Sequence, residues 1–565
     1  MCSIPWSKGI TSALATFDNP GYQSIVPKGT VLLPLLQRTR SSSLLSLLLR
    51  HSLEHGIRKY RHGLPSWFRR SSNILSSSEI GGLYHFPHQK APMVEGFERI
   101  VSRNLPLPNA MKQNTDKGAF DVVIGRNCYN EANADIGLTV KDRQRHAYII
   151  GGTGNGKTTM LKYAIVQDIK SGKGLAVIDP HGDLAEELLD YIPQERLKDV
   201  IYLNPSDIAH PVGINLLEVP EGLTDDELLN EKDFVVESIV SMFRKLFSED
   251  SSGGHRIEYI LRNAAHTAMT VEGATLFTVL KLLRNTAYRK EICSRLADDD
   301  LKDFWREELG KAGDFQRVKM SVGITAKIDR FSRSVSVKRM VDQKRSSIDF
   351  DEILNGKILI CNLAKGLIGE DTSALLGIAV LTKLQLAAYR RIRKSKQERQ
   401  PFFLYVDEFQ NFATTQFIQM LSEARKYGLR VTMAEQSVSQ QEPEMVEVIL
   451  NNVGTIVSFR TGSSRDEHLM LPHFRPYIGE GEIACLPAYS FYARIRSDEA
   501  YEPISGTTLL LGPQDRTGLS ATVIANSRRK YGTPRVDKPQ ASVEQSRRGT
   551  IVPVLLLQDK KIKIV

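Results

Sequence analysis

The chain has 565 residues, enough for three or four domains. Its 41% hydrophobic and 25% charged residues are typical of a soluble multidomain enzyme. Its five cysteines lack metal-ligand spacing, which argues against a cysteine-based metal site and indicates free thiols in a reducing compartment. The net charge of +10 suits a polyanionic partner, although many basic proteins bind no nucleic acid.

Residues 1–118 form a basic region that we predict to be partly disordered, with 12 basic and 5 acidic residues over positions 1–100. Its most apolar stretch, 31–49, is interrupted by Gln37 and Arg38, so it falls short of the roughly 20 apolar residues of a membrane span. The signature of a signal peptide is missing as well. We therefore expect a cytoplasmic protein with no membrane span of its own, and any association with the inner membrane would have to come through a partner or the basic surface.

Residues 151–159 read GGTGNGKTT, the pattern G-x-x-x-x-G-K-[ST], between the apolar strand 147–150 and a helix. The glycines let backbone N–H groups turn inward around phosphate oxygens, and the dipole of the helix favours the same negative charge. Lys157 is expected to reach the β- and γ-phosphates, and the Thr158 hydroxyl to coordinate Mg²⁺. The alternative is a Gly-rich turn that holds no ligand. The predicted nucleotide-binding residues are Gly152, Thr153, Gly154, Asn155, Gly156, Lys157, Thr158 and Thr159.

Residues 219–347 read as amphipathic helices, and no buried-strand pattern returns before 357–363. The simplest topology is an all-α module inserted into a parallel sheet. Its last helical region is strongly basic and either contacts phosphates without reading sequence or forms a solvated charged face. A later basic run, 390–396, reads as an exposed helix end. The basic residues of the module's last region are Arg317, Lys319, Lys327, Arg330, Arg333, Lys338 and Arg339.

The apolar run 402–406 ends in two carboxylates, Asp407 and Glu408. A buried parallel strand delivers the residues that follow it to the carboxyl edge of the sheet, where ligands bind. Asp407 is then expected to hold Mg²⁺ through water, and Glu408 to orient or deprotonate the attacking water. The alternative is a carboxylate pair that caps a helix N-terminus.

Two more candidates follow in the order of the chain. Arg425 lies in the segment ARKYGL and is a candidate to neutralise charge in the transition state. Gln436 follows the strand 430–435 and is a candidate to sense the γ-phosphate through a hydrogen bond. The alternative is that Arg425 is a surface charge of the helix and that Gln436 caps the end of the strand. The predicted catalytic residues are Lys157, Asp407, Glu408, Arg425 and Gln436, and the predicted Mg²⁺ ligands are Thr158 and Asp407.

The order of these motifs, with a second strand that leads into DPHGD at 179–183, resembles the HerA/FtsK superfamily of DNA-pumping ATPases. Within it, the sequence looks most like the TraG/TraD-like coupling ATPases of conjugation and type IV secretion, over about residues 120–505. The resemblance implies ATP and Mg²⁺ as cofactors and a ring, usually hexameric, that moves DNA through a central channel. It also implies that Arg425 acts on the neighbouring subunit's nucleotide and that Gln436 couples the γ-phosphate to motion. Most coupling ATPases begin with two membrane-spanning helices, a pattern that this sequence does not show.

We therefore predict an α/β fold: a RecA-like, parallel-sheet P-loop NTPase core with an inserted all-α domain and a small β-containing N-terminal region. The predicted parts are a basic region at 1–118, a small β layer at 119–145, a motor core at 146–218 and 348–505, the all-α insert at 219–347, and a flexible tail at 506–565.

Three functions compete. The first is a DNA-translocating coupling ATPase of a conjugative or type IV secretion-like system, with DNA and secretion-channel or relaxosome proteins as partners. The second is a related DNA pump in chromosome segregation or end processing. The third is a nucleotide-gated scaffold that recruits protein substrates to a secretion channel.

Overall fold

The computed structural model describes residues 102–129, 133–247, 254–311, 314–438, 441–496 and 502–533, which belong to one compact unit. The expectations for residues 1–101, including the apolar stretch 31–49, lie outside the described residues.

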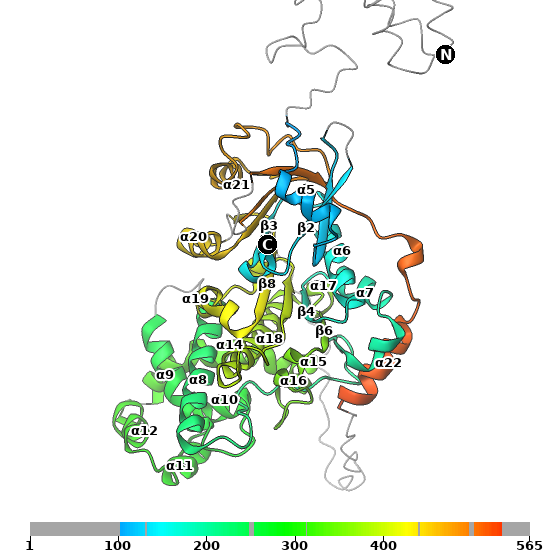
Figure 1. Cartoon of the computed structure of the whole chain (residues 1–565). Helices are drawn as coiled ribbons and strands as arrows, with labels where there is room; N and C mark the ends of the chain where they lie inside the picture. The colour runs from blue at the N-terminus through cyan, green and yellow to red at the C-terminus, as the bar shows by residue number, and fades with distance from the viewer. Residues whose placement is uncertain are drawn as a thin grey trace, which may run out of the picture. The chain divides into compact units, whose positions relative to one another are not determined.

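One sheet of eleven strands organises the described chain, in the order β2-β1-β11-β10-β9-β3-β8-β7-β4-β6-β5. Its strands run through the middle of the molecule with helices around them (Figure 1). From β9 to β5 all neighbours are parallel, whereas β10, β11, β1 and β2 extend the sheet through antiparallel pairs. The strands are β1 (Val122–Asn127), β2 (Ala134–Leu138), β3 (Ala147–Ile150), β4 (Gly174–Asp179), β5 (Val200–Leu203), β6 (Ile358–Asn362), β7 (Phe402–Val406), β8 (Leu429–Glu435), β9 (Thr455–Phe459), β10 (Ser490–Ile495) and β11 (Ile504–Thr507).

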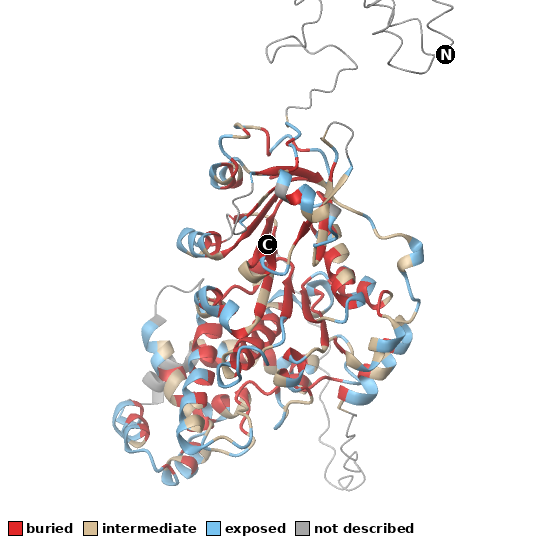
Figure 2. Ribbon diagram, in the orientation of Figure 1, coloured by how far each residue is buried: buried red, intermediate tan, exposed pale blue. Residues whose placement is uncertain are grey.

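The parallel strands are buried on both faces, because successive side chains of a strand point to opposite sides. On β4, Leu175 and Val177 join the apolar core beneath α6 (Lys157–Lys170) and α7 (Asp183–Leu189). Ala176 and Ile178, between them, join the core on the other face. Figure 2 shows the strands as a buried layer at the centre of the molecule. The predicted α/β class is confirmed.

The helices α18 (Glu370–Arg390) and α19 (Thr415–Ala424) supply the core on that second face. The remaining α-helices of the described residues outside the insert are α5 (Asn109–Asp116), α17 (Lys365–Ile368), α20 (Pro443–Asn452), α21 (Ser464–Met470) and α22 (Ser520–Tyr531).

Between β5 and β6, the described residues form helices and no strand. The module does not have a core of its own: Val236 and Phe243 of α8 belong to the same apolar cluster as Tyr148 of β3. Its helices are α8 (Asp225–Phe247), α9 (Gly254–Ala268), α10 (Leu276–Arg284), α11 (Thr286–Ser294), α12 (Asp299–Asp303), α13 (Leu309–Lys311), α14 (Asp314–Arg333), α15 (Val335–Val341) and α16 (Phe350–Leu354).

The strands predicted as a separate layer at 119–145 belong to the main sheet instead. β1 pairs with β11, with Arg126 opposite Thr507, and β11 continues through β10 to β9. β1 does not pair with β9 directly. β10 and β11, which come from the far end of the chain, lie between these two strands. The small layer is therefore an extension of the motor core.

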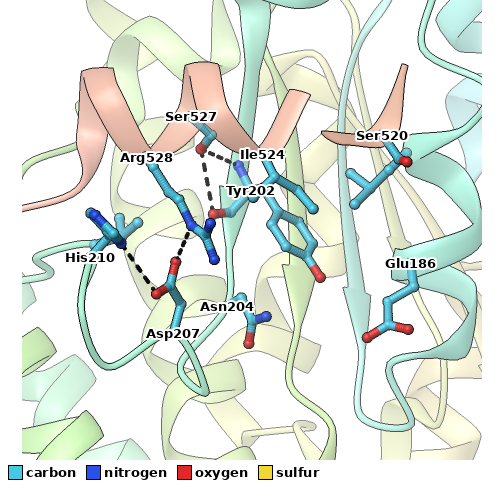
Figure 3. Close-up of a pocket in the computed structure, with 11 residues that line it drawn as sticks. Glu186, Tyr202, Asn204, Asp207, His210, Ser520, Ile524, Ser527 and Arg528 are labelled. Carbon is cyan, nitrogen blue, oxygen red and sulfur yellow. Dashed lines mark hydrogen bonds and ion pairs between the residues drawn. The ribbon is translucent and has the colours of Figure 1, made fainter. Parts of the chain in front are cut away.

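The prediction of a flexible tail from 506 is wrong for residues 506–533. The helix α22 lies against β5, where the Ser527 hydroxyl accepts a hydrogen bond of 2.9 Å from the backbone N–H of Tyr202 (Figure 3). Arg528 pairs with Asp207 at 2.5 Å. Because β5 is the last strand of the sheet, these contacts cover an edge that would otherwise expose unpaired N–H groups. Residues 534–565 lie outside the described part of the chain.

One helix of the described residues, 370–393, is long and apolar enough to cross a membrane by length and composition, but 89% of its apolar window is buried inside the protein. We interpret it as a core helix of the α/β domain.

Candidate nucleotide-binding site

The phosphate loop joins the carboxyl end of β3 to the first turn of α6. Gly156 has a φ of 109°, and a Cβ there would lie 3.0 Å from the ring of Tyr489, so only glycine fits. The loop borders a cavity of about 300 Å³ at the carboxyl edge of the parallel strands. Six of the eight predicted binding residues line this cavity: Thr153, Gly154, Gly156, Lys157, Thr158 and Thr159.

The other two predicted residues brace the loop from behind. The side-chain amide of Asn155 donates a hydrogen bond of 3.0 Å to the carbonyl of Arg460, and the backbone N–H of Gly152 donates one of 2.8 Å to the same carbonyl. The loop is thereby tied to the end of β9.

Lys157 is nearly buried, and its Nζ donates to the loop carbonyl of Gly152 at 3.1 Å. Burial lowers the pKa of Lys157, and the carboxylates of Glu408 and Asp407 act in the opposite direction. The lysine therefore lies between the loop and the acidic pair, where phosphate oxygens would compete for its N–H groups.

Asp407 follows β7 and accepts a hydrogen bond of 3.3 Å from the Thr158 hydroxyl. Burial raises the pKa of Asp407 to about 6, Glu408 and Asp179 add to this effect, and Lys157 opposes it. An oxygen pair of hydroxyl and carboxylate is the partial donor set that Mg²⁺ uses when phosphates and water complete its shell. No group of three metal-ligating His, Cys, Asp or Glu side chains occurs among the described residues.

Glu408 is held from several sides. Its Oε1 accepts a hydrogen bond of 2.6 Å from the amide of Gln436, and its Oε2 accepts one of 2.5 Å from Gln410. His181 Nε2 lies 3.7 Å from Oε1. The backbone of Glu408 is left-handed, with a φ of 48°, a strained conformation for a non-glycine residue that turns the side chain into the cavity.

Gln436 lines the cavity as predicted, and its Oε1 accepts a hydrogen bond of 3.2 Å from Thr153 in the phosphate loop. The preceding residue, Glu435, is fully buried behind it. Tyr148 donates a hydrogen bond of 3.0 Å to Glu435, and burial raises the pKa of Glu435 to about 8.

Arg425 does not enter this cavity. It lies in a turn, η8 (Arg425–Tyr427), that precedes β8, and so it stands at the amino edge of the sheet, whereas the phosphate loop stands at the carboxyl edge. Its side chain is exposed. Among the predicted catalytic residues, the structure brings Lys157, Asp407, Glu408 and Gln436 together and places Arg425 apart.

Several residues that line the cavity are absent from the site that the sequence predicts: Asp179, His181, Asp183, Leu184 and Tyr489. The segment DPHGD is recognisable as a strand end, and the pairing of β4 with β7 is what brings it beside Asp407. Tyr489 has a φ of 64° and donates its backbone N–H to the Asn155 carbonyl at 2.9 Å. No sequence signal marks it, because the contact joins residues more than 300 positions apart.

Two family models match the chain. Residues 122–363 match the central domain of the helicase HerA, and residues 401–469 match the TraM recognition site of TraD and TraG. The resemblance to HerA/FtsK-type coupling ATPases is confirmed. The two matches together include the phosphate loop, the strand that ends at Asp407, and the segment with Arg425 and Gln436.

Solved structures share the fold. The plasmid coupling protein TrwB, in complex with a non-hydrolysable GTP analogue, superposes with a TM-score of 0.53 at 17% identity, over 72% of this chain and 94% of TrwB. TrwB with ADP and Mg²⁺ gives a TM-score of 0.52 at 17% identity, over 72% and 94%, and TrwB with a non-hydrolysable ATP analogue gives 0.52 at 17%, over 76% and 97%. The core is therefore a P-loop NTPase fold. No curated protein matches the sequence.

Proposed function

We propose that the chain is an ATP-driven coupling motor that moves DNA in a conjugative or type IV secretion-like system. One observation carries the proposal: a single cavity joins the phosphate loop to the Asp407–Glu408 pair and to Gln436. The matches to HerA and to TraD and TraG support the DNA-pumping class, and the nucleotide and Mg²⁺ complexes of TrwB support ATP and Mg²⁺ as cofactors.

The residues of the cavity that the sequence predicts have the following roles in this proposal. Lys157 and the loop N–H groups bind phosphate oxygens, and Thr158 and Asp407 hold Mg²⁺. When bound, Mg²⁺ neutralises phosphate charge. Glu408, fixed by Gln410 and Gln436, orients the attacking water and accepts its proton.

The position of Arg425 supports an assembly of several copies. A guanidinium at the amino edge of the sheet is on the wrong side to reach the phosphates of its own subunit, so we propose a homo-hexameric ring in which it enters the site of the next copy. DNA would pass through the channel, and the segment 401–469 would contribute to docking a partner protein of the transfer machinery. We place this ring in the cytoplasm, in contact with the inner membrane through such partners.

The decisive experiment measures Mg²⁺-ATP hydrolysis by the full chain with and without DNA, with Lys157→Ala as the control. We expect hydrolysis that DNA stimulates and that Lys157→Ala abolishes, because the substitution removes the cation beside the phosphates. Hydrolysis that is absent under both conditions, in a protein that binds ATP, would contradict the motor and favour the nucleotide-gated scaffold.

A further inference from the structure

The turn that carries Arg425 is held by two other arginines. Arg391 donates to the carbonyl of Tyr427 at 3.1 Å and to that of Gln400 at 2.8 Å. Arg399 donates to the carbonyl of Lys426 at 2.5 Å. Two of the three carbonyls of η8 thus accept a hydrogen bond from an arginine outside the turn.

Arg391 is buried, with 3% of its surface exposed, which corrects the prediction of an exposed helix end at 390–396 for this one residue, since 392–396 are exposed as predicted. Its second terminal nitrogen donates to the carbonyl of Leu354, at the end of α16. The guanidinium therefore binds backbone carbonyls of three segments: the end of α16, the segment just before β7 and the Arg425 turn. Burying a guanidinium costs free energy unless its N–H groups are hydrogen-bonded. The backbone carbonyls around Arg391 accept from its planar fork of donors and so offset this cost.

Arg399 holds the same turn from the solvent side, and we call Arg391 and Arg399 together the clamp. Besides Lys426, its guanidinium donates to the carbonyl of Lys394 at 2.8 Å and 3.0 Å and to that of Ile392 at 3.2 Å. Its donors are committed to backbone, and the residue thus fixes the segment 392–399 to the turn. Arg425, next to this clamp, keeps an exposed side chain that is available to a second molecule.

The room around the clamp is narrow. Gly428 closes the turn with a φ of 75°, and a Cβ there would lie 3.2 Å from Nη1 of Arg391 and 3.3 Å from the carbonyl of Gln400. The glycine of ARKYGL is therefore required both by the left-handed backbone and by the close approach of the clamp.

The clamped turn borders a cavity of about 390 Å³ at the amino edge of β7 and β8. Among the described residues that line it, none is a carboxylate and five are cationic: Lys396, Arg399, Arg425, Lys426 and Arg430. A concave surface of this charge fits the phosphates of a nucleotide presented by a second copy of this chain.

We propose that Arg391 and Arg399 are positioning residues for Arg425: they hold its turn so that the guanidinium meets the triphosphate bound by the neighbouring copy. The inference rests on the proposed ring. The same two arginines link the Arg425 turn to Gln400, in the segment that leads into β7, the strand that Asp407 follows.

The first test separates charge from geometry. Arg399→Lys keeps the positive charge but cannot reach three carbonyls, because an ammonium lacks the planar fork. We expect the rate constant kcat to fall by about 10- to 100-fold, as expected for a catalytic group displaced by about 1 Å, with the affinity for an ATP analogue unchanged. Arg393→Ala, which removes a cation of the same segment that is paired with Glu227, is the control and should keep normal kcat. Unchanged kcat in Arg399→Lys and Arg399→Ala would overturn the inference.

The second test uses mixed rings, after co-assembly has been shown by mass measurement. Arg399→Ala subunits mixed with Lys157→Ala subunits should regain turnover, because some interfaces pair an intact loop with an intact arm. Arg399→Ala mixed with Arg425→Ala should not, because every arm is then defective. The reverse pattern would show that Arg399 serves its own subunit's site and would overturn the inference.

A reference mixture tells the two proposals apart. Recovery in the mixture of Arg425→Ala with Lys157→Ala supports the ring independently of the Arg399 variants. If the Arg399 variants then show no effect, the inference about the clamp fails and the proposed function stands. No recovery in that mixture overturns the ring and, with it, the role of Arg391 and Arg399, whereas ATP hydrolysis that DNA stimulates still tests the motor separately. Arg391→Lys is a further variant, and since Arg399 is only partly buried, the tests do not depend on whether the substitution of the buried Arg391 folds.

Discussion

The amide of Gln436 lies 2.6 Å from Oε1 of Glu408, so the residues that follow β8 and β7 are joined across the nucleotide cavity. Gln436 also accepts a hydrogen bond from Thr153 of the phosphate loop. One side chain therefore contacts both the loop that would bind phosphates and the carboxylate that would activate water. A γ-phosphate at the loop would compete with Glu408 for the amide of Gln436. Binding of ATP would therefore change how Glu408 is held and oriented.

Glu408→Gln should separate binding from hydrolysis. The substitution removes the proton acceptor but leaves Lys157, Thr158 and Asp407 in place, so ATP should bind with normal affinity while kcat falls by about 100- to 10,000-fold. Filter binding and a turnover assay on the same preparation measure both quantities. Wild-type turnover in Glu408→Gln would contradict the assignment of this carboxylate as the base.

Gln436→Ala should lower kcat by about 100-fold, because it frees Glu408 and removes a donor from the cavity. Binding of ADP should remain normal, since the amide contacts the region of the γ-phosphate. Gln416→Ala on α19, outside the cavity, is the matched control. Equal losses of ADP and ATP-analogue affinity without a change in kcat would assign Gln436 to general binding.

Asp407→Asn should stabilise the nucleotide-free protein at neutral pH. Its folded pKa of about 6 lies above the ordinary value of 3.8, so ionisation costs stability as the pH rises from 4 through 6. Asn removes this cost, by roughly 2 to 3 kcal/mol at pH 7.5, and the gain should shrink at pH 5. The measurement is Tm at both values. The same variant should lose the Mg²⁺ dependence of nucleotide binding, and an equal Tm for both proteins at pH 7.5 would contradict the buried charge.

Glu435→Gln tests the second buried carboxyl, whose pKa is about 8. Because the folded protein keeps its proton up to about pH 8 while the unfolded chain loses it near 4.5, the free energy of unfolding should fall as the pH rises between these values and level off above 8. Gln keeps the shape but not the titration, so its Tm advantage should grow from pH 5 to pH 8. Glu442→Gln, at an exposed glutamate before α20, should leave the profile unchanged.

Sequence patterns locate the elements whose causes are local. The phosphate loop and the Asp407–Glu408 pair are predictable because a glycine pattern and an apolar strand carry their own signals, and the edge rule for parallel sheets then places both in one cavity. The amino-edge position of Arg425 follows from the same rule, since its turn precedes β8.

Other features could not be predicted because distant residues create them. β1 joins the main sheet through Thr507, about 380 positions away, and α22 is stabilised by contacts to Tyr202 and Asp207 that no local pattern shows. In the sequence Arg391 is one charge in a basic run, and only the fold shows it buried among carbonyls.

The last prediction concerns DNA and the basic end of the helical insert. Arg333 and Lys338 are exposed on α14 and α15, whereas the side chains of Arg317, Lys319 and Arg330 lie outside the described residues. If the two exposed cations bind phosphates, reversing both to Glu should reduce the slope of log affinity against log salt by about 0.9 for each phosphate that is no longer neutralised, on unrelated duplexes alike.

Lys290→Glu provides the matched charge reversal on α11 of the same insert, at an exposed lysine outside the basic end. Measuring the affinity for two unrelated duplexes over a range of salt concentrations gives the slope for each variant. Since counterion release depends on the number of phosphates neutralised and not on the base sequence, both duplexes should change together. A slope that stays the same in the double reversal, or that falls equally in Lys290→Glu, would place the DNA path away from this end of the insert.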